Sequence, residues 1–269
     1  MIQLGTYESW FDAEPIVPGD SFPEVLENLK SYGFQGIQIA ARYRDLGWEE
    51  IGRMCKEAGV RLCIAGGGGN LLSKDPDLRR QGVAATKEGL RLAARLGAIG
   101  TICVPVRRPE IEPPAPPKTL YELQEEILIE ELAEIAPVAE EAGVSLILEP
   151  LNRYESQFLQ RLEQANKICS AVGSPNIQFM ADFFHMNIEE VDLGKAIEEN
   201  KQYLGYVHLA DSNRFEPGAG HLDLKPGLAA LKRIGYKGFM TFECKVLGKD
   251  KGKALTESAA LIRKLWDEC

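Results

Sequence analysis

Short apolar runs that alternate with longer helix-like segments constrain this chain more than any other feature. Eight runs have the character of buried strands, at residues 2–7, 36–40, 60–65, 101–106, 144–151, 177–183, 205–210 and 239–244. The segments between them are rich in Ala, Leu, Glu, Lys and Arg, which lose little on entering a helix, and lie at 23–32, 48–58, 78–96, 120–142, 158–172, 195–200, 224–234 and 254–266. Glycine, which readily ends a helix, precedes the next strand in "AGV" at 58–60 and "LGA" at 96–98. The pattern predicts a repeated strand–helix unit.

Eight such units in 269 residues predict a (β/α)₈ TIM barrel of parallel strands, a fold of the α/β class. The competing architecture is an open doubly wound sheet. No G-x-G-x-x-G follows the first strand-like run, and no change of composition divides the chain into halves. We therefore expect one barrel domain that spans residues 1–269.

Composition and charge narrow the class of protein. The net charge of −9 disfavours a nucleic-acid partner, which would require a basic face. The sequence has neither an uncharged apolar run of membrane-spanning length nor an amino-terminal basic and apolar signal segment. None of the six cysteines lies in a C-x-x-C pair, which favours reduced, buried thiols. We therefore expect a cytoplasmic protein without a membrane partner.

Metal-capable side chains follow four successive strands of the predicted barrel. The chemistry of such barrels is located at the carboxyl ends of the strands. Those ends present Glu149, Asp182, His208 and Glu243, each about one strand–helix unit from the next. Three carboxylates and one imidazole suit Mn²⁺ or Mg²⁺, with Co²⁺ and Zn²⁺ as alternatives. Any one of them could be a solvated charge at the rim, but four in succession favour a metal site.

The motifs around these residues resemble a known family. "EPLNRYE", "ADFFHMNIEE", "VHLADSNR" and "FECK" are similar to the xylose-isomerase-like TIM-barrel family, in the branch of D-tagatose and D-allulose 3-epimerases. The similarity covers essentially the whole chain and extends to 5-keto-gluconate-type epimerases through "DSNRFEPGAGHLD". The resemblance implies metal ligands at Glu149, Asp182, His208 and Glu243, an acid/base pair at Glu149 and Glu243, and substrate contacts from His185, Arg214 and Glu155. By analogy it also implies a homodimer or homotetramer.

The chemistry of epimerisation agrees with that residue set. A carbon next to a ketone must lose its proton on one face and regain it on the other, so a base is needed on each face. Carboxylates from the non-adjacent fifth and eighth strands, Glu149 and Glu243, can flank a sugar or sugar-acid substrate. The intermediate is an enediolate, whose developing charge a divalent cation stabilises.

Other readings of the supporting residues remain open at this point. His185 could be a buried structural histidine, and Arg214 could be a surface charge. Glu155 could pair with Arg153 at the surface, and Asp211 could either orient His208 or cap a turn.

Two further segments bear on substrate binding. Arg107 and Arg108 follow the fourth strand and could pair with the carboxylate of a keto-sugar acid, although Glu110 or Glu112 could neutralise them instead. The amides of Gly66–Gly69 could approach a phosphate, but no Lys-Ser/Thr follows, which favours a plain flexible loop.

Three competing functions share this barrel. An aldose–ketose isomerase similar to hydroxypyruvate isomerase would move the proton between adjacent carbons. An endonuclease IV-type hydrolase binds three zinc ions with many histidines, whereas this chain has three histidines and an acidic net charge. A non-catalytic sugar-binding barrel would be expected to lack one of the paired glutamates. The sequence therefore favours a metal-dependent epimerase of a ketose or keto-sugar acid.

Overall fold

Eight parallel strands form a curled sheet in the computed structural model, which describes residues 2–108 and 110–269. The strands are β1 (Gln3–Tyr7), β2 (Gly36–Gln38), β3 (Arg61–Leu62), β4 (Gly100–Cys103), β5 (Ser145–Leu148), β6 (Ile177–Asp182), β7 (Leu204–Leu209) and β8 (Phe239–Phe242). Their order is β3-β2-β1-β8-β7-β6-β5-β4. A parallel bridge between Ile64 and Gly100 joins β3 to β4 and closes the ring. The barrel predicted from the sequence is confirmed.

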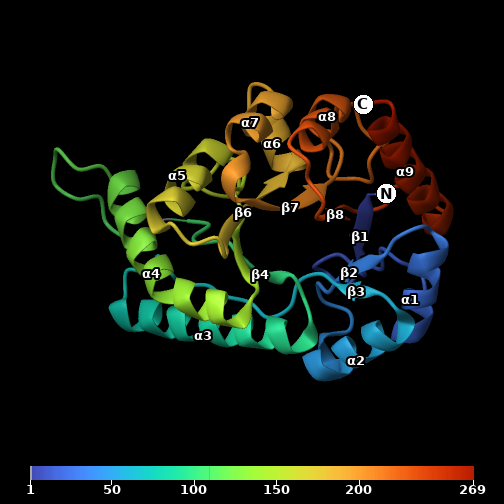
Figure 1. Cartoon of the computed structure of the whole chain (residues 1–269), viewed down its shortest axis with the longest axis horizontal. Helices are drawn as coiled ribbons and strands as arrows, with labels where there is room; N and C mark the ends of the chain where they lie inside the picture. The colour runs from blue at the N-terminus through green and yellow to red at the C-terminus, as the bar shows by residue number, and fades with distance from the viewer. Residues whose placement is uncertain (1, 109) are drawn as a thin grey trace.

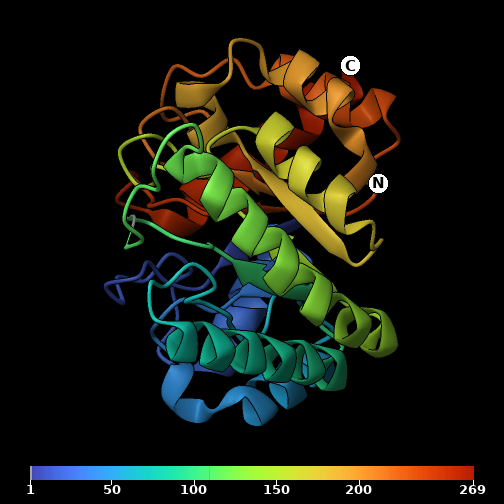
Figure 2. The ribbon, with the colours of Figure 1, turned by 90° about the vertical axis from the view of Figure 1, so that its left-hand side faces the viewer.

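Helices surround the strands on the outside of the ring (Figure 1). They are α1 (Phe22–Ser31), α2 (Trp48–Ala58), α3 (Pro76–Leu96), α4 (Leu120–Ala142), α5 (Leu162–Val172), α6 (Phe183–Glu189), α7 (Leu193–Glu199), α8 (Lys225–Arg233) and α9 (Lys251–Asp267), with short 3₁₀ turns η1 (Arg44–Leu46) and η2 (Lys201–Tyr203). The long helices α3 and α4 pack side by side (Figure 2).

Local sequence signals fix where these helices begin and end. The Thr119 hydroxyl accepts the backbone N–H of Glu122, and the Glu122 carboxylate accepts the N–H of Thr119 in return, which caps the start of α4. Gly59 and Gly97 adopt the left-handed conformation that ends α2 and α3. The predicted "AGV" and "LGA" stops are thus helix ends.

Helix α6 differs from the sequence-based expectation. The apolar run at 177–183 was expected to be a strand ending in Asp182 and His185, but the strand ends at Asp182 and a helix begins at once. The Asp182 carboxylate accepts the backbone N–H groups of Phe184 and His185, which is an N-cap interaction. This cap overrides the strand preference of the two phenylalanines, so His185 lies in the first turn of a helix and the strand-end placement was wrong.

Apolar side chains fill the inside of the ring and the layer between strands and helices. The inner cluster contains Cys63, Ile64, Ile147, Met180, Tyr206 and Phe239. A methyl group at Gly36 would lie 2.5 Å from both Cys63 and Phe239, so glycine is required for this packing. The filled interior leaves the carboxyl ends of the strands as the floor of an open site.

The cysteines are free thiols, and all except Cys269 are buried. Burial, which the sequence predicted, raises the pKa of Cys63 and of Cys103 to about 12. Within residues 2–108 and 110–269, no helix is long and apolar enough to cross a membrane.

Candidate active site and metal centre

Four buried side chains converge where β5 to β8 end. Glu149 directly follows β5, Asp182 ends β6, His208 lies in β7 and Glu243 directly follows β8. One ligand atom from each lies within 4.8 Å of the others. The parallel register, which pairs Asp182 with His208, produces this convergence. The structure therefore brings together the four residues that the sequence singled out as metal-capable.

The Nδ1 atom of His208 faces the three carboxylates. It lies 3.0 Å from Glu243 Oε2 and 3.6 Å from both Glu149 Oε1 and Asp182 Oδ2. Although it is buried, it makes no well-aligned hydrogen bond within the described part of the chain. Burial alone would lower the pKa of His208, but the carboxylates, Glu243 above all, raise it well above its usual value. The cluster therefore attracts positive charge and could hold a divalent metal ion.

A buried amide sets the orientation of this imidazole. His208 Nε2 lies 3.0 Å from Gln38 Oε1, which also accepts the hydroxyl of Tyr206 at 2.9 Å. Gln38 Nε2 donates to the Tyr7 hydroxyl at 2.8 Å. Because Oε1 can only accept, Nε2 of the imidazole carries the proton and a neutral His208 directs its Nδ1 lone pair at the carboxylates. Sequence analysis missed Gln38, whose one signal was a polar residue inside an apolar run.

Arg214 bridges two of the carboxylates. Its Nη1 atom donates to Asp182 Oδ2 at 3.0 Å, and its Nη2 atom donates to Glu243. Burial acts to raise the pKa of both carboxyl groups, but the guanidinium, aided by neighbouring histidines, holds each pKa below its usual value. Arg214 thus keeps two candidate metal ligands ionised, and it is not the surface charge that the sequence left open.

Two features hold Arg214 in place. Its guanidinium lies 4.5 Å from the ring centroid of Phe184, a cation–π contact. Asp211 accepts backbone N–H groups from Ser212, Gly218 and Leu222, which organises the loop that carries Arg214. Asp211 therefore caps a loop and does not orient His208.

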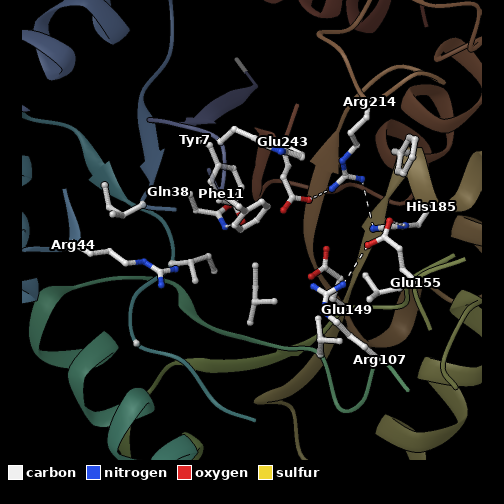
Figure 3. A pocket seen from close by; sticks show the side chains of 18 of the residues that line it. Tyr7, Phe11, Gln38, Arg44, Arg107, Glu149, Glu155, His185, Arg214 and Glu243 are labelled. Carbon is white, nitrogen blue, oxygen red and sulfur yellow. Dashed lines mark hydrogen bonds and ion pairs between the residues drawn. The ribbon is translucent and has the colours of Figure 1, made fainter. Parts of the chain in front are cut away.

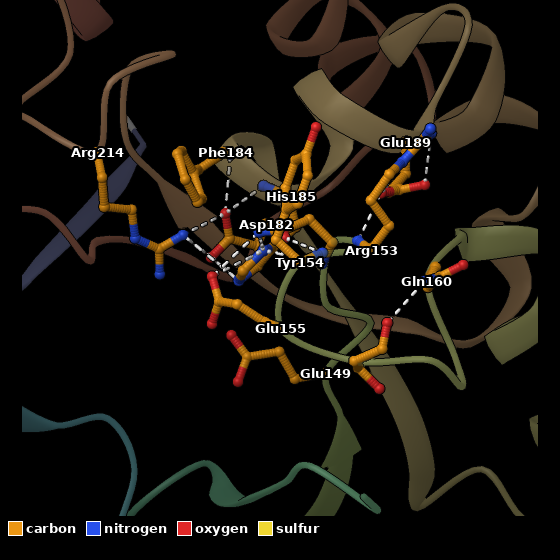
Figure 4. Close-up of polar contacts among 12 residues, drawn as sticks. Glu149, Arg153, Tyr154, Glu155, Gln160, Asp182, Phe184, His185, Glu189 and Arg214 are labelled. Atoms are coloured by element: carbon orange, nitrogen blue, oxygen red, sulfur yellow. Dashed lines mark hydrogen bonds and ion pairs between the residues drawn. The ribbon is translucent and has the colours of Figure 1, made fainter. Parts of the chain in front are cut away.

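His185 and Glu155 lie beside Asp182 and Glu149, two of the candidate metal ligands (Figure 4). The Nδ1 atom of His185 accepts the backbone N–H of Asn152 at 3.1 Å, which leaves the proton on Nε2, 3.8 Å from Asp182 Oδ2. Glu155 Oε1 accepts a hydrogen bond from Asn152 Nδ2 at 3.0 Å. Arg153 pairs with Glu189 and not with Glu155. Sequence analysis missed Asn152, which positions both side chains.

These residues open onto a cavity of about 480 Å³ (Figure 3). Trp10, Phe11, Trp48 and Phe184 supply aromatic surface, and Glu149, Glu243 and His185 supply polar groups. Aromatic surface and a few convergent polar groups suit a small polar ligand such as a sugar.

The two arginines after β4 have different positions. Arg107 lines the cavity and donates to Glu155 Oε2 at 3.2 Å, with 61% of its side chain exposed. Arg108 is absent from the described cavity lining and borders a neighbouring depression with Glu110, which Arg107 also lines. Arg44, which sequence analysis missed, lines the main cavity.

The fold and the site define a metal-capable barrel of the sugar-isomerase type, and the comparison with known families agrees. A family model described as "Xylose isomerase-like TIM barrel" matches residues 26–265. The chain belongs to this family.

Individual relatives are carbohydrate epimerases. The chain is 29% identical to 3-dehydro-D-guloside 4-epimerase of Escherichia coli K12, over 97% of this chain and 99% of that protein. It is 31% identical to L-ribulose 3-epimerase of Mesorhizobium japonicum, over 90% and 81%. The solved apo structure of 3-keto-D-glucoside 4-epimerase from E. coli superposes with a TM-score of 0.83 at 27% identity, covering 98% of this chain and all of that one. These similarities support an isomerase of the carbohydrate-epimerase kind.

Proposed function

We propose that the chain is a divalent-metal-dependent epimerase of a ketose or keto-sugar acid that moves a proton at the carbon next to the carbonyl. The observation that carries this proposal is the buried cluster of Glu149, Asp182, His208 and Glu243, of which Glu149 and Glu243 line the cavity. The donor set is rich in carboxylate oxygens, so we propose Mn²⁺ as the metal, with Mg²⁺, Co²⁺ and Zn²⁺ as alternatives.

In this proposal Glu149 and Glu243 form the acid/base pair. They come from β5 and β8, which are separated in the ring by β6 and β7, and both line the cavity. A sugar carbon held between them would lose its proton to one carboxylate and receive a proton from the other on the opposite face. A divalent cation held by the cluster would supply electrostatic stabilisation for the negative charge that develops on the substrate oxygens.

The neighbouring side chains would hold the substrate. His185 presents an Nε2–H donor and Arg214 a guanidinium beside the two carboxylates, so they would donate to oxygens near the reacting carbon. Glu155 would accept from a hydroxyl group. Arg107 would reach the substrate only after exchanging its contact with Glu155.

The position of the reacting carbon is part of the proposal. We propose carbon 3 of a 2-ketose, as in the relatives named 3-epimerases. The similarity over nearly the full length to a 4-epimerase favours a second candidate, carbon 4 of a 3-keto sugar, which requires the same proton chemistry. A homodimer or homotetramer also remains a proposal from family analogy.

Substitution of the paired glutamates tests the mechanism. Glu149→Gln and Glu243→Gln should each abolish epimerisation in the metal-loaded protein, since each removes the base on one face. One of them should still exchange the substrate proton with D₂O, because a single base suffices for exchange. Glu257→Gln, an exposed site on α9, is the matched control. Normal turnover by either cavity variant would refute the two-base mechanism.

A further inference from the structure

One cation in the cavity has no partner. Arg44, in the turn η1 that follows β2, lines the cavity, and Figure 3 shows its guanidinium directed into the open space. Its side chain makes no hydrogen bond or ion pair with any residue in 2–108 or 110–269. The other two arginines that line the cavity are both occupied, Arg107 by Glu155 and Arg214 by Asp182 and Glu243.

Arg44 lies across the cavity from the groups proposed to hold the reacting carbons. In the closed ring, β2 is four strands from β6, which precedes His185, so the two residues lie on opposite walls. Figure 3 shows the same separation, with Glu243 and Glu149 between them. A substrate whose reacting carbon lies between the two glutamates would therefore extend its far end towards Arg44.

The wall of the cavity near β2 and β3 offers a second donor. Gly66 follows β3, the neighbour of β2 in the ring, and lines the same cavity as Ile39, Ile64 and Trp48. Within the described residues, the backbone N–H of Gly66 donates to no acceptor. Arg44 is exposed and Gly66 is half-buried, so a compact oxyanion could reach both groups from the cavity mouth and would accept a hydrogen bond from each.

We propose that Arg44 and Gly66 form a subsite for a carboxylate or phosphate at the far end of the substrate. This inference rests on the proposed function and narrows its substrate class to anionic keto sugars. It also moves the carboxylate contact predicted from the sequence away from Arg107 and Arg108, because Arg107 is already paired and Arg108 borders another depression.

Three ligands that differ only at carbon 6 test the subsite. Calorimetric titration of the metal-loaded protein measures the Kd of D-fructose, D-fructuronate and D-fructose 6-phosphate. We expect at least one anion to bind about tenfold more tightly than D-fructose, an advantage that falls as salt is added. The tighter of the two anions identifies carboxylate or phosphate as the group recognised.

Variants assign the effect to Arg44. Arg44→Gln should weaken binding of the favoured anion about tenfold and leave D-fructose unchanged, whereas Arg44→Lys should retain part of the preference. Arg91→Gln, which removes an exposed guanidinium on the outer helix α3, is the control. If neither anion binds more tightly than D-fructose, or if Arg44→Gln weakens all three ligands equally, the subsite is refuted.

Proton exchange measured on the same samples separates this inference from the proposed function. Exchange of the D-fructose carbon-3 proton without any anion preference would refute the subsite and leave the epimerase proposal standing. An Arg44-dependent anion preference without exchange of any ligand would support the subsite and count against the epimerase proposal.

Discussion

Replacing Gln38 with methionine should weaken metal binding without touching a metal ligand. Methionine has a similar length and volume but cannot accept the His208 Nε2–H, which lies 3.0 Å from Gln38 Oε1. A buried donor left without an acceptor costs about 1–3 kcal/mol. A neutral imidazole can avoid that cost by moving its proton to Nδ1, the atom that faces the carboxylates, and it then loses the lone pair that would bind the metal.

The expected loss of metal affinity follows from the loss of the hydrogen bond between His208 Nε2 and Gln38 Oε1. Loss of such an outer hydrogen bond typically lowers metal affinity by about 10- to 100-fold, which corresponds to roughly 1.4–2.7 kcal/mol. Calorimetric titration of metal-free protein with Mn²⁺ measures it directly. Tyr206→Phe is the matched control, because it removes a hydroxyl from Gln38 Oε1 and leaves the contact with His208 intact. Gln38→Glu keeps the acceptor and should bind Mn²⁺ at least as tightly as the wild type.

Two results would refute this reasoning. The first is wild-type Mn²⁺ affinity in folded Gln38→Met. The second is an equal loss in Tyr206→Phe, which would assign the effect to the buried network as a whole and not to the contact between Gln38 and His208.

Further predictions concern the barrel, the site and the thiols. Gly100→Ala places a methyl group 1.9 Å from the Ser145 carbonyl oxygen, and denaturant unfolding should show that the free energy of unfolding falls by about 3 kcal/mol. Gly143→Ala, whose methyl group would have no atom within 4 Å, should lower it by about 1 kcal/mol. Arg214→Lys cannot bridge Asp182 and Glu243 in the same way, so kcat/KM should fall about tenfold or more; an unchanged value would remove Arg214 from the site. After alkylation of the native protein at about pH 8, mass spectrometry should detect modification of Cys269 alone, because burial keeps the other thiols protonated. Early modification of Cys103 would contradict the packing.

The charged residues at the strand ends could be predicted from the sequence because two independent signals identify them. An apolar run identifies each strand, and a charged residue at its end is too costly to bury without a partner. That reasoning located Glu149, Asp182, His208 and Glu243, which the structure gathers within one site. It needed only the order of the strands and the parallel register of the ring.

Other parts of the site could not be predicted, because they depend on contacts between distant segments. Gln38 reaches His208 across 170 positions of sequence, and Asn152 reaches His185 across 33. Asn152 lies within "EPLNRYE", but nothing in that motif indicates a contact with His185, and Gln38 lies in none of the quoted motifs. The start of α6 depends on the Asp182 side chain, whose capping role competes with the strand preference of "FF".

Deuterium uptake from D₂O, located by NMR, tests the central claim most directly. The Mn²⁺-loaded protein is incubated with free ketoses and keto-sugar acids, with a chelator-treated sample alongside. We predict deuterium at one carbon next to the ketone, two epimeric products, and no uptake after the metal is removed. Full uptake by metal-free protein, or deuterium on carbon 1 with an aldose as the product, would contradict the account.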